Sequence, residues 1–551
     1  MKSIQIIFQK FKTQINSSFY ALFTFKYNVA RLWKEVACSF MICTLLLSNS
    51  CQQGQDKTVH TLKVNFQEGD LPSLHPHSLM IYLRGICVAK TLYECLTRID
   101  AQGTVQLAGA KSVEVSPDQL RYTFTLRDNK WSDGSPVTAH QYEKAWKHAL
   151  SPVSTCSRAD LLYMIKNAQE AKMGDLPIDA VGIKALDDKT LVVELAYPSP
   201  YFLELAAQPI CAPMIDPAKE EQTVFNGPFI VEEWKHNDKL CLAPNTSYWD
   251  KGHVGLKRIE IFMVQDAMTA YSMFEKKQLD WIGVPMSPLS TELIVNMKKE
   301  NSLKSHPVDR AFWVFLNTQQ PALSSPAIRK ALSLAVDRKA ITEHILIGGH
   351  PLEKPLPKAL LPINPSSNLK QDLTEAQRLF EMGLKEMGLT KETFPAIVVT
   401  YSQQANRKQV AEYLQQAWSS AFGIQVKLEN QEWNVLRTNL EKGLYEISGC
   451  YEAAFYKDPM ELMEKMVTVS NNNFSKWTTA QFSEKVLLAK QQADPKKRME
   501  ILGEAEQILM EQMPFIPICS DELLFSHRSG LDGYAFDYVG AVDFSKASFA
   551  Q

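Results

Sequence analysis

The sequence has few features that would tie it to metal, nucleotide or redox chemistry. Its ten cysteines are scattered over 551 residues, and none lies in a CxxC pair or another close metal-binding spacing. It contains no GxGxxG, GxxxxGK[ST], HExxH or GxSxG motif. The closest histidines, His75 and His77, flank a proline, which makes at most half a metal site and is more typical of a solvated turn. These absences favour binding over catalysis, with a hydrolase assembled from distant residues as an alternative.

Long apolar runs are scarce as well. The run VACSFMICTLLL, from Val36 to Leu47, is too short for an ordinary membrane span, and the first fifty residues carry six basic residues against one acid. This pattern predicts a secretory signal over residues 1–50. Because the run ends in SNSC, Cys51 resembles the lipidation site of a bacterial lipoprotein, although the usual leucine lies one residue further back. Residues 51–58 then form a polar tether. A plain secretion signal and a short buried helix are the alternatives.

The chain also lacks an excess of basic charge. It has 59 Lys and Arg against 61 Asp and Glu, and without residues 1–50 the net charge is about −7. No block of consecutive basic residues is left that could follow a phosphate backbone, which argues against nucleic acid as a partner. The seven cysteines after Cys51 are an odd, scattered set, which predicts mostly buried thiols rather than a disulfide framework.

What the sequence does have is the composition of a soluble globular protein, with 45% hydrophobic and 22% charged residues, and enough length for roughly three domains. The stretch RYTFTL alternates polar and apolar residues as a strand does, and SDGSP after it is a turn. Thr138 and Gln141 form a capping box that opens a helix with Tyr142 and Trp146 on one face.

Further along, residues 394–430 read as strand, helix and strand, with Gly423 closing the helix. This is a βαβ unit, whose crossover is almost always right-handed. A mixed α/β protein is therefore predicted.

The segment YTFTLRDNKWSDGSPVTAHQYEKAWKHALSP resembles the signature region of the family-5 extracellular solute-binding proteins, the oligopeptide-binding subunits of ABC peptide importers. Further landmarks occur in the family's order between about residues 60 and 530, among them PSPYFLELAAQP, AYSMFEKKQLDW, NQEWNVL and DPKKRMEILGEAEQILMEQMPFIPI.

The resemblance implies a type II-like periplasmic binding protein fold, with two α/β lobes joined by hinge strands and a third, inserted domain. Lobe I is expected to comprise residues 59–95, 190–305 and 515–551. The inserted domain is expected to be 96–189, which makes KWSDGSP a structural marker, and lobe II is expected to be 306–514. The ligand is expected to bind between the lobes and to be held through its backbone.

The stretch YEISGCYEAAFYKDP matches the cleft segment of the family. Where relatives have an aspartate that pairs with the peptide's α-amino group, this chain has Phe455, and a pocket tryptophan is replaced by Glu452. A basic residue of some relatives is here Gly449. Because a buried ammonium without a counter-charge is unfavourable, three explanations stay open. Glu452 supplies the carboxylate, the amino end lies elsewhere, or the ligand is not an ordinary peptide. A solvent-facing Glu452 is the plain alternative.

The predicted ligand-binding residues are thus Glu452, Tyr451, Phe455, Trp433 and Trp313, and each aromatic among them is also a candidate for ordinary core packing. Asp458, before Pro459, is expected to organise a turn. If Glu452 meets an amino group, Glu452→Gln should weaken binding of free-amine peptides by roughly 1–3 kcal/mol and leave N-acetylated peptides little changed.

The resemblance predicts a lipid-anchored protein in the periplasm, attached to the cell membrane, with no enzyme activity and no cofactor or metal. It would capture oligopeptides and pass them to the permease subunits of an ABC transporter. Alternatives are a receptor for a specialised ligand, such as a cell-wall tripeptide or glutathione, and a surface interaction protein that reuses the fold. Family relatives also bind dipeptides, nickel chelates or haem. A peptidase is a third class.

Overall fold

The computed structural model describes residues 60–67, 69–361, 369–403, 406–492 and 494–550. The contacts within the chain separate Met1–Thr61 from Leu62–Gln551, and nearly all described residues belong to the second unit. The predicted signal, the tether and Cys51 lie outside the described residues. Helices and sheets alternate along the second unit, so the predicted mixed α/β class is confirmed.

One sheet combines the start of the described chain with residues from its middle, in the order β1-β10-β9-β8, and β8, β9 and β10 in it are antiparallel neighbours. Its strands are β1 (Thr61–Asn65), β8 (Phe229–Lys235), β9 (Lys239–Pro244) and β10 (Arg258–Phe262). Helix α2 (Leu83–Leu92) contacts β8, and helices α6 (Ala267–Glu275) and α7 (Thr291–Lys299) follow β10 in the chain.

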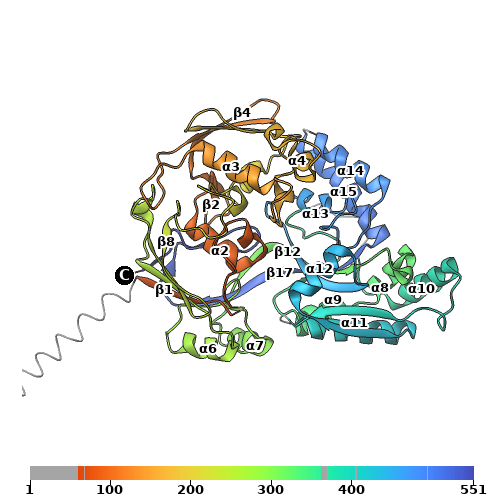
Figure 1. The fold of residues 1–551 in the computed structure, drawn as a ribbon. Coiled ribbons are helices and arrows are strands. Elements are labelled where there is room, and N and C mark those ends of the chain that lie inside the picture. The colour runs from red at the N-terminus through yellow and green to blue at the C-terminus, as the bar shows by residue number, and fades with distance from the viewer. Residues whose placement is uncertain (1–59, 68, 362–368, 404–405, 493, 551) are drawn as a thin grey trace, which may run out of the picture. The chain divides into compact units, whose positions relative to one another are not determined.

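The signature segment contributes β5 to a second sheet, which has the order β4-β5-β7-β6. The same segment also contains helix α3 (Ala139–Ala149) (Figure 1). Its strands are β4 (Ala110–Val115), β5 (Arg121–Leu126), β6 (Ile183–Ala185) and β7 (Thr190–Glu194). Alternate residues of β5 are buried, as the period of two predicts. Thr138 N donates to the Gln141 side chain at 2.9 Å, and Tyr142 and Trp146 are buried, so the predicted strand, capping box and helix face are all confirmed.

The largest sheet has the order β11-β17-β12-β16-β14-β15, with β13 paired to β17. Its strands are β11 (Trp281–Gly283), β12 (Lys304–Leu316), β13 (His350–Pro351), β14 (Ile397–Ser402), β15 (Val426–Gln431), β16 (Ile447–Ala453) and β17 (Phe515–His527). Strands β12 and β17, each of 13 residues, run antiparallel side by side (Figure 1). They begin within two residues of the predicted lobe boundaries at 306 and 515, and the boundaries themselves stay a prediction.

The described helices between β12 and β17 in the chain pack on this sheet in part. They are α8 (Pro326–Leu334), α9 (Arg338–His344), α10 (Leu373–Met387), α11 (Arg407–Phe422), α12 (Trp433–Lys442), α13 (Met460–Glu464), α14 (Ala480–Gln491) and α15 (Pro495–Gln512). The packing on the sheet is through α8, α9, α11 and α12. Strands β14 and β15 pair in parallel through α11, so the predicted βαβ unit is confirmed. Gly423 ends α11 with a φ of +71°, a conformation that suits glycine.

Short elements complete the described chain: β2 (Thr97–Ile99), β3 (Val105–Leu107), α4 (Ala168–Met173), α5 (Phe202–Leu205), β18 (Leu531–Asp532), β19 (Ala535–Phe536), β20 (Val542–Asp543) and β21 (Ser548–Phe549). No described helix has the length and apolar character needed to cross a membrane. The seven described cysteines are all free thiols, and six of them are buried, which matches the expectation of small buried residues.

Candidate functional site

Strand β16 is paired along its full length on one side and only at its beginning on the other. Residues 447–453 pair with β12, whereas β14 pairs only with Ile447 and Ser448. Within the described chain, no backbone hydrogen bond reaches the outer edge of β16 from Gly449 to Ala453. This edge is an open template for another extended chain, because a strand edge presents unpaired N–H and C=O groups.

A cavity of about 180 Å³, with room for on the order of ten water molecules, is lined by Tyr451, Glu452 and Ala453 of this segment of β16. Its wall combines residues from distant parts of the chain: Met80, Ile81, Leu83, Ile86, Arg158, Arg310, Arg437, Tyr451, Glu452, Ala453, Phe455, Lys465, Asn472, Phe474 and Val539. Of the five predicted ligand-binding residues, the cavity therefore brings together Tyr451, Glu452 and Phe455.

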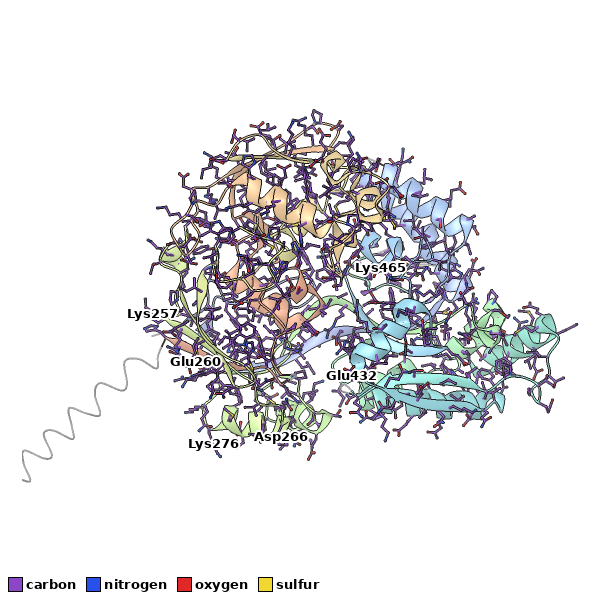
Figure 2. All side chains as sticks on the ribbon, in the orientation of Figure 1. Lys257, Glu260, Asp266, Lys276, Glu432 and Lys465 are labelled. Atoms are coloured by element: carbon purple, nitrogen blue, oxygen red, sulfur yellow. The ribbon has the colours of Figure 1, made fainter. Side chains whose placement is uncertain are left out.

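Glu452 is already engaged in an ion pair. Its Oε2 accepts a hydrogen bond from Lys465 Nζ at 2.8 Å, and both side chains are almost buried. Lys465, labelled in Figure 2, directly follows α13, and its Nζ also lies 3.6 Å from Oε1 of Glu461. Burial alone would lower the pKa of Lys465, but Glu452 and Glu461 outweigh it and raise that pKa. The ammonium is therefore charged at every ordinary pH.

Glu461 connects this ion pair to Arg158, which lies in the predicted inserted domain, residues 96–189. Arg158 Nη2 donates to its Oε1 at 2.9 Å, and the guanidinium also binds Asp160 with two hydrogen bonds of 3.1 Å. Burial opposes the charge of Arg158, yet the two carboxylates raise its pKa further above its usual range. Asp160, Arg158, Glu461, Lys465 and Glu452 thus form one chain of alternating charges along the cavity.

Phe455 is buried beneath Arg158. The guanidinium carbon lies 4.5 Å from the centre of its ring, a cation–π arrangement. Its N–H donates to Glu461, and its carbonyl accepts from Gln208 Nε2 at 3.1 Å. A protein cation therefore already covers the face of this ring.

Tyr451 is held between cations as well. The guanidinium carbons of Arg310 and Arg407 lie 4.4 and 4.8 Å from the centre of its ring. Arg310 forms an ion pair with Asp521, which raises the pKa of the arginine against the effect of burial. The ring of Tyr451 packs edge-on against Phe312, so its hydroxyl is kept near Asp521 at 3.4 Å.

The two predicted tryptophans lie outside the wall of this cavity. Trp313 is buried to 1% exposure, stacks on Phe515 at 3.9 Å and donates to the carbonyl of Pro355. This packing leaves its indole no open surface for a ligand, so we assign it to the core. Trp433 is the first residue of α12, behind the cap residue Glu432 labelled in Figure 2, and is half-buried. Trp433 does not line the cavity, whereas Arg437, one turn later on the same helix, does.

Local sequence patterns hardly indicated the four cations in the wall, Arg158, Arg310, Arg437 and Lys465. Glu461 and Lys465 have the spacing of a helical i, i+4 pair, which was a usable local signal. Arg158 meets Glu461 across 303 residues, and no local pattern encodes such a contact.

The expectation of a solvated turn at His75 and His77 was wrong. Both are buried, and His148 approaches each ring centre to 6.4 Å. Burial and the two neighbouring histidines lower the pKa of His77 to about 3, so it is neutral. Among the described residues, no group of three His, Cys, Asp or Glu has the geometry of a metal site.

Asp458 does organise the turn at Pro459, as predicted, because its Oδ1 accepts from Met460 N at 2.9 Å. The structure adds a buried ion pair, in which Arg498 Nη1 and Nη2 donate to the two Asp458 oxygens at 2.6 and 2.8 Å. A separate cavity of about 20 Å³ beside Lys90 and Glu94 holds no more than one or two waters, and we regard it as structural.

Comparison with known proteins gives consistent results. A family model described as bacterial extracellular solute-binding proteins, family 5 Middle, matches residues 104–474. The oligopeptide-binding protein OppA of Bacillus subtilis is 34% identical over 519 residues, covering 91% of this chain and 95% of that protein. The dipeptide-binding protein DppE of the same organism is 32% identical, covering 82% and 85%. The crystal structure of a periplasmic oligopeptide-binding protein from Borrelia burgdorferi matches with a TM-score of 0.79 and 27% identity, covering 89% and 100%.

Proposed function

The chain belongs to the bacterial extracellular solute-binding proteins of family 5, and on that premise we propose that it captures oligopeptides beside β16 and delivers them to the permease of an ABC transporter. Membership confirms the predicted type II-like α/β fold and the prediction that the chain is not an enzyme. The names of the two Bacillus subtilis relatives support peptides as the solute.

The observation that carries this proposal is the open edge of β16, in a segment that lines the cavity. An extended peptide can add to residues 449–453 as a further strand and satisfy its own N–H and C=O groups there. Main-chain bonding of this kind is insensitive to side-chain identity. The cavity also has room for water molecules. Bridging waters would satisfy the polar groups of different ligand side chains, so the cavity would accommodate varied side chains.

Within this proposal, Tyr451 and Glu452 contribute the backbone of the edge, and Phe455 with Arg158 closes one end of the cavity. Trp433 supports α12, whose Arg437 reaches the wall. Strands β12 and β17 act as the hinge between lobe I (59–95, 190–305 and 515–551) and lobe II (306–514), and residues 96–189 form the inserted domain. Closure about this hinge would enclose the peptide and present a defined shape to the permease.

Delivery to a permease requires the protein to stay at the outer face of the membrane. We propose that residues 1–50 direct export and that a lipid on Cys51 anchors the mature chain, with residues 51–58 as the tether. Growth with radiolabelled palmitate tests this: label should enter the protein and disappear in Cys51→Ala. Label that persists in Cys51→Ala would exclude this cysteine.

Native mass spectrometry of the purified protein tests the central proposal. We expect adducts with the masses of short peptides, which mild denaturation releases intact. A peptide so identified should bind again, and versions with methylated backbone nitrogens should bind more weakly, because methylation removes the ladder hydrogen bonds. Release of cleaved fragments would indicate a peptidase. Absence of any adduct, together with no thermal shift from peptide pools, would refute the proposal.

A further inference from the structure

The cavity beside β16 is lined by more cations than anions, and this imbalance bears on which ligand it selects. Four cationic side chains, Arg158, Arg310, Arg437 and Lys465, face one carboxylate, Glu452. We propose that the cavity selects ligands that place a carboxylate in it, foremost peptides with an acidic side chain. This inference rests on the proposed peptide-binding function and specifies its ligand class.

Each arginine in the wall keeps donor groups that the protein does not use. Arg158 and Arg310 bind their acids through Nε and Nη2, and Arg437 binds Glu441 through Nε at 3.0 Å. Within the described chain, no acceptor meets Nη1 of the three guanidiniums or Nη2 of Arg437. Guanidinium groups with free donors match the geometry of a carboxylate, which accepts two parallel hydrogen bonds.

The acids that pair with the three arginines are not part of the cavity wall. They are Asp160 and Glu461 beside Arg158, Asp521 beside Arg310, and Glu441 beside Arg437. Glu452 is the one acid that reaches the wall, and Lys465 already occupies one of its oxygens. Fixed cations therefore stand nearer to a bound ligand than their counter-charges do. A ligand ammonium would be repelled by four cations, whereas a carboxylate would be attracted.

Phe455 strengthens this conclusion. It offers no charge to an ammonium, and Arg158 covers its ring. Of the three explanations that the sequence left open, the structure therefore favours a ligand whose amino end lies outside this cavity.

Matched peptide pools test the preference. The probes are tri- to hexapeptides with one Glu, the same pools with Gln in its place, and versions of both with an amidated C-terminus or an acetylated N-terminus. Calorimetric titration of the purified full chain at low salt should show the Glu pools binding at least about tenfold more tightly than the Gln pools, as expected for a charge-assisted hydrogen bond.

Arg437→Gln is the variant of choice, because its partner Glu441 is partly exposed on the same helix and no buried acid is stranded. It should reduce the ratio of the Glu-pool affinity to the Gln-pool affinity. Arg378→Gln is the matched control, since Arg378 pairs with Glu375 on an exposed face of α10. The control should keep the full preference.

These probes distinguish a side-chain carboxylate from the C-terminal carboxylate. They also distinguish a failure of the carboxylate preference from a failure of the proposed peptide binding. If amidation, rather than the Glu to Gln change, weakens binding tenfold, the carboxylate is the C-terminus and the preference for a carboxylate stands. If neither change matters and acetylation weakens binding, the cavity takes an ammonium and the inference is overturned, while peptide binding survives. Binding of no pool would overturn the proposed function and this inference together.

Discussion

Glu506 provides a quantitative test of how burial acts on charge in this fold. It lies in α15, is 1% exposed, and accepts a hydrogen bond from Leu356 N at 3.0 Å through Oε1. Burial raises its pKa from 4.5 to about 7, against smaller opposite effects of that hydrogen bond and of Lys354. The carboxyl group is therefore protonated in the folded chain at a pH where it is ionised in the unfolded chain.

The sign of the pH dependence follows directly. A raised folded-state pKa stabilises the fold fully below about pH 4.5, and this contribution is lost as the pH rises through about 7. A shift of this size corresponds to about 3 kcal/mol of unfolding free energy between pH 4 and pH 8. Glu506→Gln removes the titrating group but keeps an oxygen that can accept from Leu356. The variant should equal the wild type near pH 4 and exceed its stability by up to about 3 kcal/mol near pH 8.

Urea unfolding at several pH values between 4 and 8.5 measures this difference. Glu500→Gln is the control, because Glu500 is exposed on the same helix and its replacement should leave the pH profile parallel to that of the wild type. If the Glu506→Gln profile also runs parallel to the wild type, the carboxyl group is not held protonated by burial and the reasoning fails.

Two further substitutions test packing elsewhere in the same region. Arg498→Met should lower the unfolding free energy by about 3–5 kcal/mol, because it leaves the Asp458 carboxylate buried without its partner. Asp458→Asn in the same chain should recover much of the loss. Equal melting temperatures of the single and double variants would contradict this. Gly383→Ala should lower the unfolding free energy by about 1–3 kcal/mol, because the alanine Cβ would lie 2.7 Å from the Ile328 side chain. This loss should exceed the gain from the helix preference of alanine. A higher melting temperature would show that α8 and α10 can separate.

Local patterns accounted for the elements of the fold that local interactions determine. The alternation of Tyr122, Phe124 and Leu126, the Thr138 cap and the closing Gly423 each act within a few residues, so the sequence contains their full cause. The family resemblance implied two lobes joined by hinge strands, whereas the pairing of β12 with β17 is a long-range contact that no local pattern predicted.

The candidate site was predicted only in part, because its character depends on distant contacts. The segment around Glu452 lines a cavity, but the lysine that occupies its carboxylate directly follows α13 and was not predicted. Trp313 looked like a wall residue and is core, since Phe515, about 200 residues later, stacks on it. His75 and His77 looked like a polar turn and are buried, because the neighbouring helix brings His148 over them.

The central place of β17 in its sheet has a consequence for biosynthesis. Residues 281–283, 304–315 and 350–351 all pair with a strand that begins at residue 515. A ribosome must therefore synthesise the chain beyond residue 515 before this sheet can be completed, and until then no strand lies between β11 and β12. Such late, long-range pairing is slow. It would keep the nascent chain loosely structured, the condition in which a narrow translocation channel can thread it.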